Sequence, residues 1–151
     1  AEIILRNYSD YFESFIILRP FFIYGPKQNI NMLIPQLIKK VYYNEEITIE
    51  GKKGIKINPI YIEDAALATM KTINLKGKHI INIAGNEILN LKEIILNIAK
   101  ILNKKPRIKT VESKKISLIA DITEMRQKLH TPQTNFQEGL EKTIDFYKKI
   151  L

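Results

Sequence analysis

The chain has 151 residues, of which 45% are hydrophobic and 26% charged, a composition ordinary for one globular domain with its own core. It contains no cysteine, which excludes disulfides and thiolate metal sites. No apolar run approaches membrane-spanning length, so we expect no membrane partner and a cytoplasmic location. The net charge of +8 comes from lysines spread along the chain without a basic stripe, so we expect no nucleic-acid partner.

A mainly apolar stretch rich in β-branched residues, interrupted by Arg19, runs from about Phe15 to Phe22. It predicts a strand covered on both faces, as in a parallel sheet with helices on each side. Pro20 cannot donate to a central ladder, and Gly25-Pro26 predicts a turn directly afterwards. Ligand sites of open α/β sheets lie where such strands end. An ordinary core strand followed by a loop has the same pattern, so this stretch alone leaves both interpretations open.

The rest of the chain alternates between helical and extended patterns. Apolar spacing and capping residues predict helices over about 1–12, 32–43, 63–75, 90–102, 121–129 and 135–151. β-Branched runs predict shorter strands over 47–50, 56–62, 79–84 and 107–111. This alternation indicates an α/β fold. Only 79–84 is comparable with the first strand, so either the short strands complete the sheet or the rest of it lies outside this chain.

Several polar residues have both a structural and a functional interpretation. We predict that Asp64 starts a helix and orients a neighbouring loop, and is not a catalytic acid. Arg19 lies in a predicted buried strand, where it faces an anionic ligand or forms an internal ion pair. Neither His79 nor His130 has a histidine four residues away or a carboxylate cluster, so no metal site is predicted. The glycines at 51 and 54 lie between strands, which is the wrong place for a phosphate-binding loop.

Four motifs occur in order along the chain: LRPFFIYGP at 18–26, NPIYIEDAA at 58–66, INIAGN at 81–86 and QEGL at 137–140. Together they resemble the C-terminal half of an extended short-chain dehydrogenase/reductase of the NAD-dependent epimerase/dehydratase family. The resemblance covers essentially the whole chain. It implies the C-terminal part of a Rossmann-like fold, with parallel-sheet strands plus a small mixed α/β substrate-binding subdomain. Residues 1–151 would form one unit, the substrate-side portion of such an enzyme.

The resemblance also implies where the chemistry lies. Members of this family carry a catalytic Tyr-x-x-x-Lys motif, often followed a few residues later by an Ala-Glu pair such as Ala1-Glu2. No tyrosine in this sequence is followed four residues later by lysine. We therefore expect no catalytic residue in this chain, with the catalytic pair and the dinucleotide-binding half preceding Ala1. That half, or a second copy of the chain, is the expected partner, and the cofactor is NAD or NADP bound mainly by the missing half.

Positions that match the family's sites carry roles implied by the resemblance. The cofactor-binding positions are Pro20, Phe21 and Tyr24. The substrate-binding positions are Phe22, Asn31, Met32, Leu33, Thr48, Lys56 and Tyr61. Phe22 stands where nucleotide-sugar epimerases and dehydratases carry an Asn that contacts the substrate, and Phe cannot make that hydrogen bond. Ile57 stands where many nucleotide-sugar members carry an Arg for the diphosphate, and strand alternation points the adjacent Lys56 to the other face.

The function implied by the resemblance is the substrate-binding portion of an NAD(P)-dependent epimerase, dehydratase or reductase. Its substrate would be a sugar, in particular a nucleotide sugar. The alternative is a non-enzymatic binding or sensor module that kept the scaffold without the chemistry. In either case we expect the flanks of the Phe15 strand to be exposed, so that the chain associates, exchanges strands or retains a complementary fragment.

Overall fold

The computed structural model describes residues 2–112 and 117–151 and has the predicted α/β character. The helices are α1 (Glu2–Arg6), α2 (Leu33–Tyr42), α3 (Ile62–Lys71), α4 (Leu91–Leu102), α5 (Thr123–Lys128) and α6 (Phe136–Tyr147), with short 3-10 segments at Ser9–Tyr11 and Thr72–Asn74. The strands are β1 (Ser14–Pro20), β2 (Ile23–Tyr24), β3 (Glu46–Glu50), β4 (Lys56–Ile57), β5 (Ile60–Tyr61), β6 (Gly77–Ile83), β7 (Leu89–Asn90), β8 (Arg107–Val111) and β9 (Ser117–Leu118). Over the described ranges, none of the helices combines the length and the apolar character needed to cross a membrane.

The longest strands, β1 and β6, pair in parallel, with Ser14 opposite Gly77 and Pro20 opposite Ile83. β1 ends at Pro20, so the prediction that this strand continues to Phe22 is wrong. The strand ends there because Phe22 has φ +45°, a value that an extended strand does not accommodate. The two strands therefore present their carboxyl ends at the same edge.

The short strands form ladders of their own and do not extend the β1–β6 pair. β2 pairs with β5 and β3 with β8, both in parallel, while β4 lies between antiparallel β7 and parallel β9. Within the described residues, β1 therefore has β6 as its sole ladder partner. The short strands that the structure describes therefore do not complete a covered sheet around β1, which was one of the two predicted alternatives.

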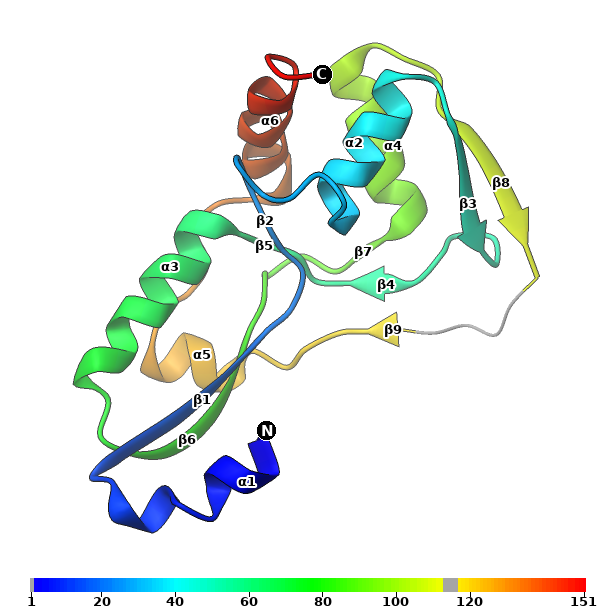
Figure 1. Ribbon diagram of the computed structural model, residues 1–151. Helices are drawn as coiled ribbons and strands as arrows, with labels where there is room; N and C mark the ends of the chain where they lie inside the picture. The colour runs from blue at the N-terminus through cyan, green and yellow to red at the C-terminus, as the bar shows by residue number, and fades with distance from the viewer. Residues whose placement is uncertain (1, 113–116) are drawn as a thin grey trace.

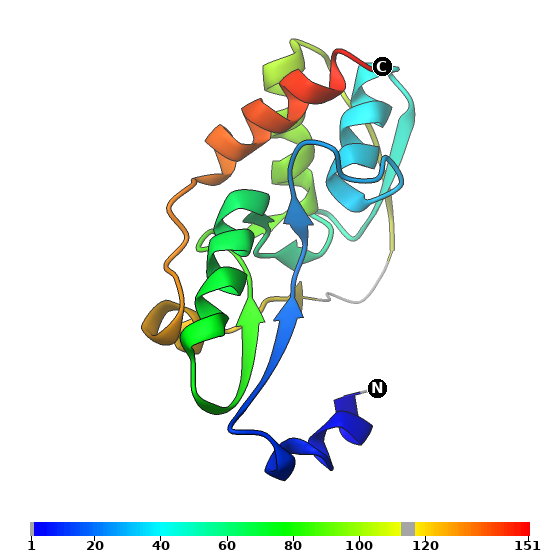
Figure 2. The same ribbon diagram turned by 60° about the vertical axis from the view of Figure 1, so that its left-hand side comes forward.

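Two hydrophobic clusters hold these elements in place. The first packs α2, α4 and α6 together with β3, through residues such as Ile38, Ile95 and Leu140. The second packs β6 against α3 and α5, through residues such as Ile81 and Met125. Figure 1 shows the helices of the first cluster gathered at one end of the molecule and β1, β6, α3 and α5 at the other. In Figure 2, α1 lies on the opposite side of the β1–β6 pair from α3.

The starts of α4 and α6 follow the predicted capping residues, whereas α5 has Ile122 at its N-cap without a side-chain cap. Asn90 accepts a hydrogen bond from the Glu93 N–H at 3.0 Å, and the Glu93 carboxylate accepts one from the Asn90 N–H at 2.8 Å, which completes the predicted capping box. Asn135 caps α6 in the same way by accepting from the Glu138 N–H at 2.8 Å. Both caps satisfy backbone donors that the first helical turn leaves unpaired.

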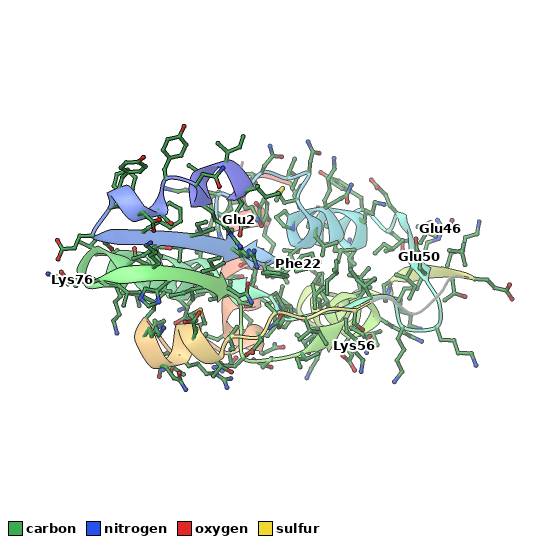
Figure 3. All side chains as sticks on the ribbon, turned by 90° about the horizontal axis from the view of Figure 1, so that it is seen from below. Glu2, Phe22, Glu46, Glu50, Lys56 and Lys76 are labelled. Carbon is green, nitrogen blue, oxygen red and sulfur yellow. The ribbon has the colours of Figure 1, made fainter. Side chains whose placement is uncertain are left out.

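β1 is only half covered, since none of its residues is fully buried. The prediction that Arg19 lies in a buried strand is therefore wrong, because its side chain is 44% exposed. Its Nη2 donates to Glu2 Oε1 at 2.5 Å, and Arg6 donates to the same oxygen at 2.8 Å. Hydrogen bonds from Arg19, and then from Arg6, lower the pKa of Glu2 to about 2. This ion-pair group links α1 to β1, and Figure 3 shows Glu2 beside that strand.

Candidate binding pocket at the end of β1

A pocket of about 370 Å³ lies where β1 ends, within the range of roughly 300–1,000 Å³ that is typical of small-molecule sites. Its walls come from the end of β1, from β2, from the loop that follows and from the first turn of α2. They are formed by Pro20, Phe22, Ile23, Gln28, Met32, Leu33 and Ile34. Carboxyl ends of parallel strands are the usual edge for ligand sites in open α/β sheets, so this pocket is the candidate site.

Phe22 lies at the point where the backbone leaves the β1–β6 ladder and joins the β2–β5 ladder. The Phe21 N–H still donates to Ile83 O at 2.9 Å, as a continuation of the β1–β6 pair. The next carbonyl, of Phe22, accepts from the Ile60 N–H at 3.3 Å, beside the β2–β5 pair. The positive φ of Phe22 makes this change of direction possible. Figure 3 shows Phe22 just beyond the end of β1.

Gln28 fixes the loop that closes the pocket. Its Nε2 donates to Ile23 O at 2.7 Å, and its backbone oxygen accepts a hydrogen bond from the Tyr147 hydroxyl of α6. The remaining polar atom of the side chain, Oε1, is buried and has no hydrogen-bond partner among the described residues. The wall of the pocket therefore combines apolar side chains with one neutral acceptor and carries no charged residue.

Four of the residues assigned to ligands by the resemblance meet in this pocket. They are Pro20, Phe22, Met32 and Leu33. The resemblance did not assign Ile23 or Gln28, because Ile23 belongs to an apolar run and Gln28 to a polar loop without any periodic signal. Gln28 is identified only by its buried, unpaired oxygen, which a sequence does not reveal.

The other assigned residues lie outside the pocket wall. Tyr24 and Tyr61 belong to the first core cluster and are only 1% and 3% exposed. Phe21 packs against the second cluster. Asn31, Thr48 and Lys56 are exposed, Thr48 on β3 and Lys56 on β4. The cofactor and substrate roles of all these residues stay predictions.

Tyr24 is poorly suited to acid–base work in this position. Burial, together with the nearby Glu87 carboxylate, raises the pKa of the Tyr24 hydroxyl. That hydroxyl donates to Phe136 O at 3.2 Å, and the ring packs against Tyr61 with the centroids 5.7 Å apart. Tyr24 therefore anchors the start of α6 to β2.

Asp64 organises a second buried polar group, away from the pocket wall. Its carboxylate is in the first turn of α3 and accepts from the N–H groups of Gln133 and Thr134, both at 2.9 Å, and contacts His130 Nε2 at 2.7 Å. Burial by itself would raise the pKa of Asp64, but these hydrogen bonds outweigh it and lower the pKa below its usual value of 3.8. Asp64 thus starts a helix and orients the loop before α6, as predicted. Across the described part of the chain, no three His, Asp or Glu side chains are grouped to hold a metal ion.

Comparisons with known proteins agree with this architecture. The sequence model of the NAD dependent epimerase/dehydratase family matches residues 1–84, more than half of the chain. A UDP-glucuronate 4-epimerase of Thermodesulfobacterium geofontis is 28% identical over 138 residues, which cover 88% of this chain and 43% of that protein. A dTDP-4-dehydro-6-deoxy-D-allose reductase of a Streptomyces species is 24% identical over 98% of this chain and 48% of its own length.

The structural comparison covers almost every residue. The crystal structure of UDP-glucuronic acid 4-epimerase from Bacillus cereus, in complex with UDP-glucuronic acid and NAD, aligns with a TM-score of 0.87 and 28% identity over 99% of this chain and 50% of that one. The fold is thus of the Rossmann-like α/β class of these enzymes. The chain belongs to the NAD-dependent epimerase/dehydratase family. It spans about half the length of the relatives that it matches.

Proposed function

We propose that this chain supplies the substrate-binding portion of an NAD(P)-dependent epimerase, dehydratase or reductase acting on a nucleotide sugar. The observation that carries the proposal is the pocket at the end of β1, which lies within the part of the chain that matches the family. The relatives with which the chain shares its fold act on UDP- or dTDP-linked sugars. A site at this edge suits a ligand held between two halves of an α/β enzyme.

The pocket suits the sugar or the nicotinamide of such ligands, but it does not suit their charged pyrophosphate. Its apolar wall, with Pro20 and Phe22, suits flat or weakly polar groups such as a nicotinamide or a sugar ring. It offers no cation for a pyrophosphate, and the sequence has no glycine-rich phosphate loop. We therefore propose that the dinucleotide is bound mainly by a separate nucleotide-binding half. When bound, NAD(P) supplies hydride transfer, and the role of this chain is to orient the sugar and exclude water.

The catalytic acid–base group is proposed to come from that same half. The sequence has no Tyr-x-x-x-Lys motif, and the Tyr24 hydroxyl is committed to Phe136. β1 has a free edge within the described residues, where a further parallel strand can be added. This free edge and the coverage of about half of each relative support a partner half, in the same polypeptide or as a separate chain.

The absence of that motif also favours a second candidate function. A non-enzymatic binding or sensor module would use the same pocket to bind a nucleotide sugar and would turn nothing over. The two candidates share ligand binding and differ in hydride transfer, so two separate measurements are needed.

Binding is tested on this chain by isothermal titration calorimetry with UDP-glucose, dTDP-glucose and NAD, using AMP as the control nucleotide. We expect saturable binding of at least one nucleotide sugar. NAD should bind weakly or not at all, since we propose that the dinucleotide is bound mainly by the separate nucleotide-binding half. A folded chain that binds neither nucleotide sugar would contradict the proposed function in both its forms.

Chemistry is tested with a chimera in which the N-terminal half of the T. geofontis UDP-glucuronate 4-epimerase precedes Ala1. We expect the chimera to retain NAD and to form reduced cofactor, detected by fluorescence, when its nucleotide sugar is added. The intact relative serves as the control for folding and cofactor content. A chimera that holds NAD and binds the sugar without ever reducing the cofactor would support the sensor module.

A further inference from the structure

The side chain of Gln28 is held in one orientation. Its Nε2 donates to Ile23 O at 2.7 Å. Turning the amide over would place Oε1 against that carbonyl, so that two acceptors would face each other. The amide therefore keeps its nitrogen on Ile23 and its oxygen free. The contact from the Tyr147 hydroxyl to the Gln28 backbone oxygen fixes the residue from its other side.

The free oxygen of Gln28 needs a donor. It is buried and has no hydrogen-bond partner within residues 2–112 and 117–151, and Gln28 itself is one of the residues that line the pocket. Buried polar atoms of folded proteins are nearly always paired, with protein, water or ligand. An acceptor that the fold leaves unpaired in a pocket is thus a position at which a bound molecule can contribute an O–H or N–H group.

The rest of the pocket wall restricts what that molecule can be. Its other members are apolar, and none of its side chains carries a positive charge. A carboxylate or phosphate oxygen placed here would face another acceptor without any cation to compensate it, which is unfavourable away from water. A hydroxyl group attached to a ring with apolar faces satisfies both requirements.

We propose that Gln28 Oε1 is a specificity element that accepts a hydrogen bond from a hydroxyl of a neutral sugar ring. The pocket would therefore take the sugar of a neutral nucleotide sugar and disfavour a uronic acid or the diphosphate at this position. This inference rests on the proposed function, because it assumes a nucleotide-sugar ligand. It separates the chain from relatives that act on UDP-glucuronate.

The test uses this chain with UDP-glucose, UDP-glucuronic acid and UDP as probes, titrated by calorimetry. The test variant is Gln28→Met, which keeps the length of the side chain and removes the acceptor. The matched control is Gln36→Met, because Gln36 is exposed on α2 outside the pocket wall. We expect wild-type chain to bind UDP-glucose more tightly than UDP-glucuronic acid or UDP. Gln28→Met should bind UDP-glucose about tenfold more weakly, the size expected of one hydrogen bond, and Gln36→Met should be unchanged.

A second measurement needs no variant. Single-deoxy derivatives of UDP-glucose are titrated against wild-type chain, and the ¹⁵N and ¹H resonances of the Gln28 side-chain amide are followed by NMR. We expect one deoxy derivative to lose about tenfold in affinity and to leave the Gln28 amide unshifted, while UDP-glucose shifts it. In Gln28→Met, the same derivative should bind as well as UDP-glucose.

The outcomes separate this inference from the proposed function. If no nucleotide sugar binds, both are overturned. If UDP-glucose binds but Gln28→Met binds it equally well, or if UDP alone shifts the Gln28 amide as UDP-glucose does, only the role of Gln28 is overturned. Preferred binding of UDP-glucuronic acid would also overturn it. Circular dichroism of Gln28→Met verifies that loss of the contact with Ile23 has not unfolded the chain.

Discussion

Gly139 of α6 lies directly against Tyr24 of β2. A Cβ built on Gly139 would lie 2.5 Å from the Tyr24 hydroxyl oxygen and 2.8 Å from Tyr61 Cδ2, distances that real Cβ atoms essentially never show. The Tyr24 hydroxyl cannot move away freely, because it donates to Phe136 O at the start of the same helix. α6 can therefore pass this close to the rings of Tyr24 and Tyr61 only because Gly139 has no side chain.

We predict that Gly139→Ala destabilises the fold. Alanine is the better helix former by about 1 kcal/mol, but overpacking a buried contact typically costs about 1–3 kcal/mol. The free energy of unfolding, measured by urea denaturation, should fall. Glu141→Ala, an exposed change on the same helix, should stay within about 0.5 kcal/mol of wild type. A Gly139→Ala chain more stable than wild type would show that helix propensity outweighs the contact.

Asp64 should make the stability of the fold depend on pH. Since the folded-state pKa of Asp64 lies below its usual value of 3.8, its contribution is fully present above about pH 4. It is lost as the pH falls through the lower, folded-state pKa. We predict that Asp64→Asn lowers the free energy of unfolding by roughly 2–4 kcal/mol at neutral pH, because one backbone donor loses its acceptor and the charge-assisted bonds are lost. In acid the difference from wild type should shrink.

The control for this prediction is Glu63→Gln, an exposed change on the neighbouring residue of α3. Urea denaturation at neutral pH and at a series of pH values below 4 should show a wide gap in the free energy of unfolding between Asp64→Asn and wild type that closes only below about pH 4. For Glu63→Gln the gap should be small at every pH. A gap for Asp64→Asn that widens in acid would contradict the assigned direction of the pKa shift.

We predict that the side-chain hydrogen bonds of Asn58, which follows β4, are the main link to the segment before α5. It is 2% exposed, its Nδ2 donates to Ala120 O at 2.9 Å, and its Oδ1 accepts from the Ala120 N–H at 3.0 Å. Asn58→Ala leaves both backbone groups of Ala120 unpaired, so the free energy of unfolding should fall by roughly 2–4 kcal/mol. Faster amide exchange at Ala120 should accompany the loss. Asn74→Ala, at an exposed asparagine, is the control, and equal effects of the two changes would refute the prediction.

We predict that the chain associates in solution through the apolar surface at its N-terminal end. Ile3 and Tyr11 are each 81% exposed and Phe12 is 56% exposed, beside a strand whose second edge is free among the described residues. Analytical ultracentrifugation should show a concentration-dependent rise in mass. Tyr11→Lys combined with Phe12→Lys should reduce it, while Ile73→Lys, at an isoleucine 82% exposed beyond α3, should not. A chain that stays monomeric at all concentrations would contradict this.

Local signals in the sequence were enough to place most elements. The capping pattern of Asn90 and Glu93 depends on residues three positions apart, so its prediction was confirmed in detail. The β-branched run from Phe15 predicted the longest strand, although its end at Pro20 depends on the positive φ of Phe22, which no propensity of Phe suggests. The alternation of helices and strands gave the correct fold class.

Long-range relations were the part that the sequence could not supply. Asp64 and His130 are 66 residues apart, and nothing in the spacing of either residue indicates the other. The parallel pairing of β3 with β8 joins two short segments whose patterns would suit many partners. Gln28 is singled out only because Ile23 O accepts from its amide nitrogen while its buried oxygen has no partner among the described residues. Such facts arise from the packed fold.

The backbone turn at Phe22 has a consequence for how this pocket could diversify. A φ of +45° is energetically unfavourable for a residue with a bulky side chain and is tolerated far better by asparagine or glycine. Replacing Phe22 by asparagine would thus reduce the backbone strain and add a hydrogen-bond donor and an acceptor to the pocket. The single substitution Phe22→Asn could therefore change which ligands the pocket prefers without a stability cost from the backbone. Position 22 is thus a site at which evolution can readily exchange an apolar for a polar pocket wall.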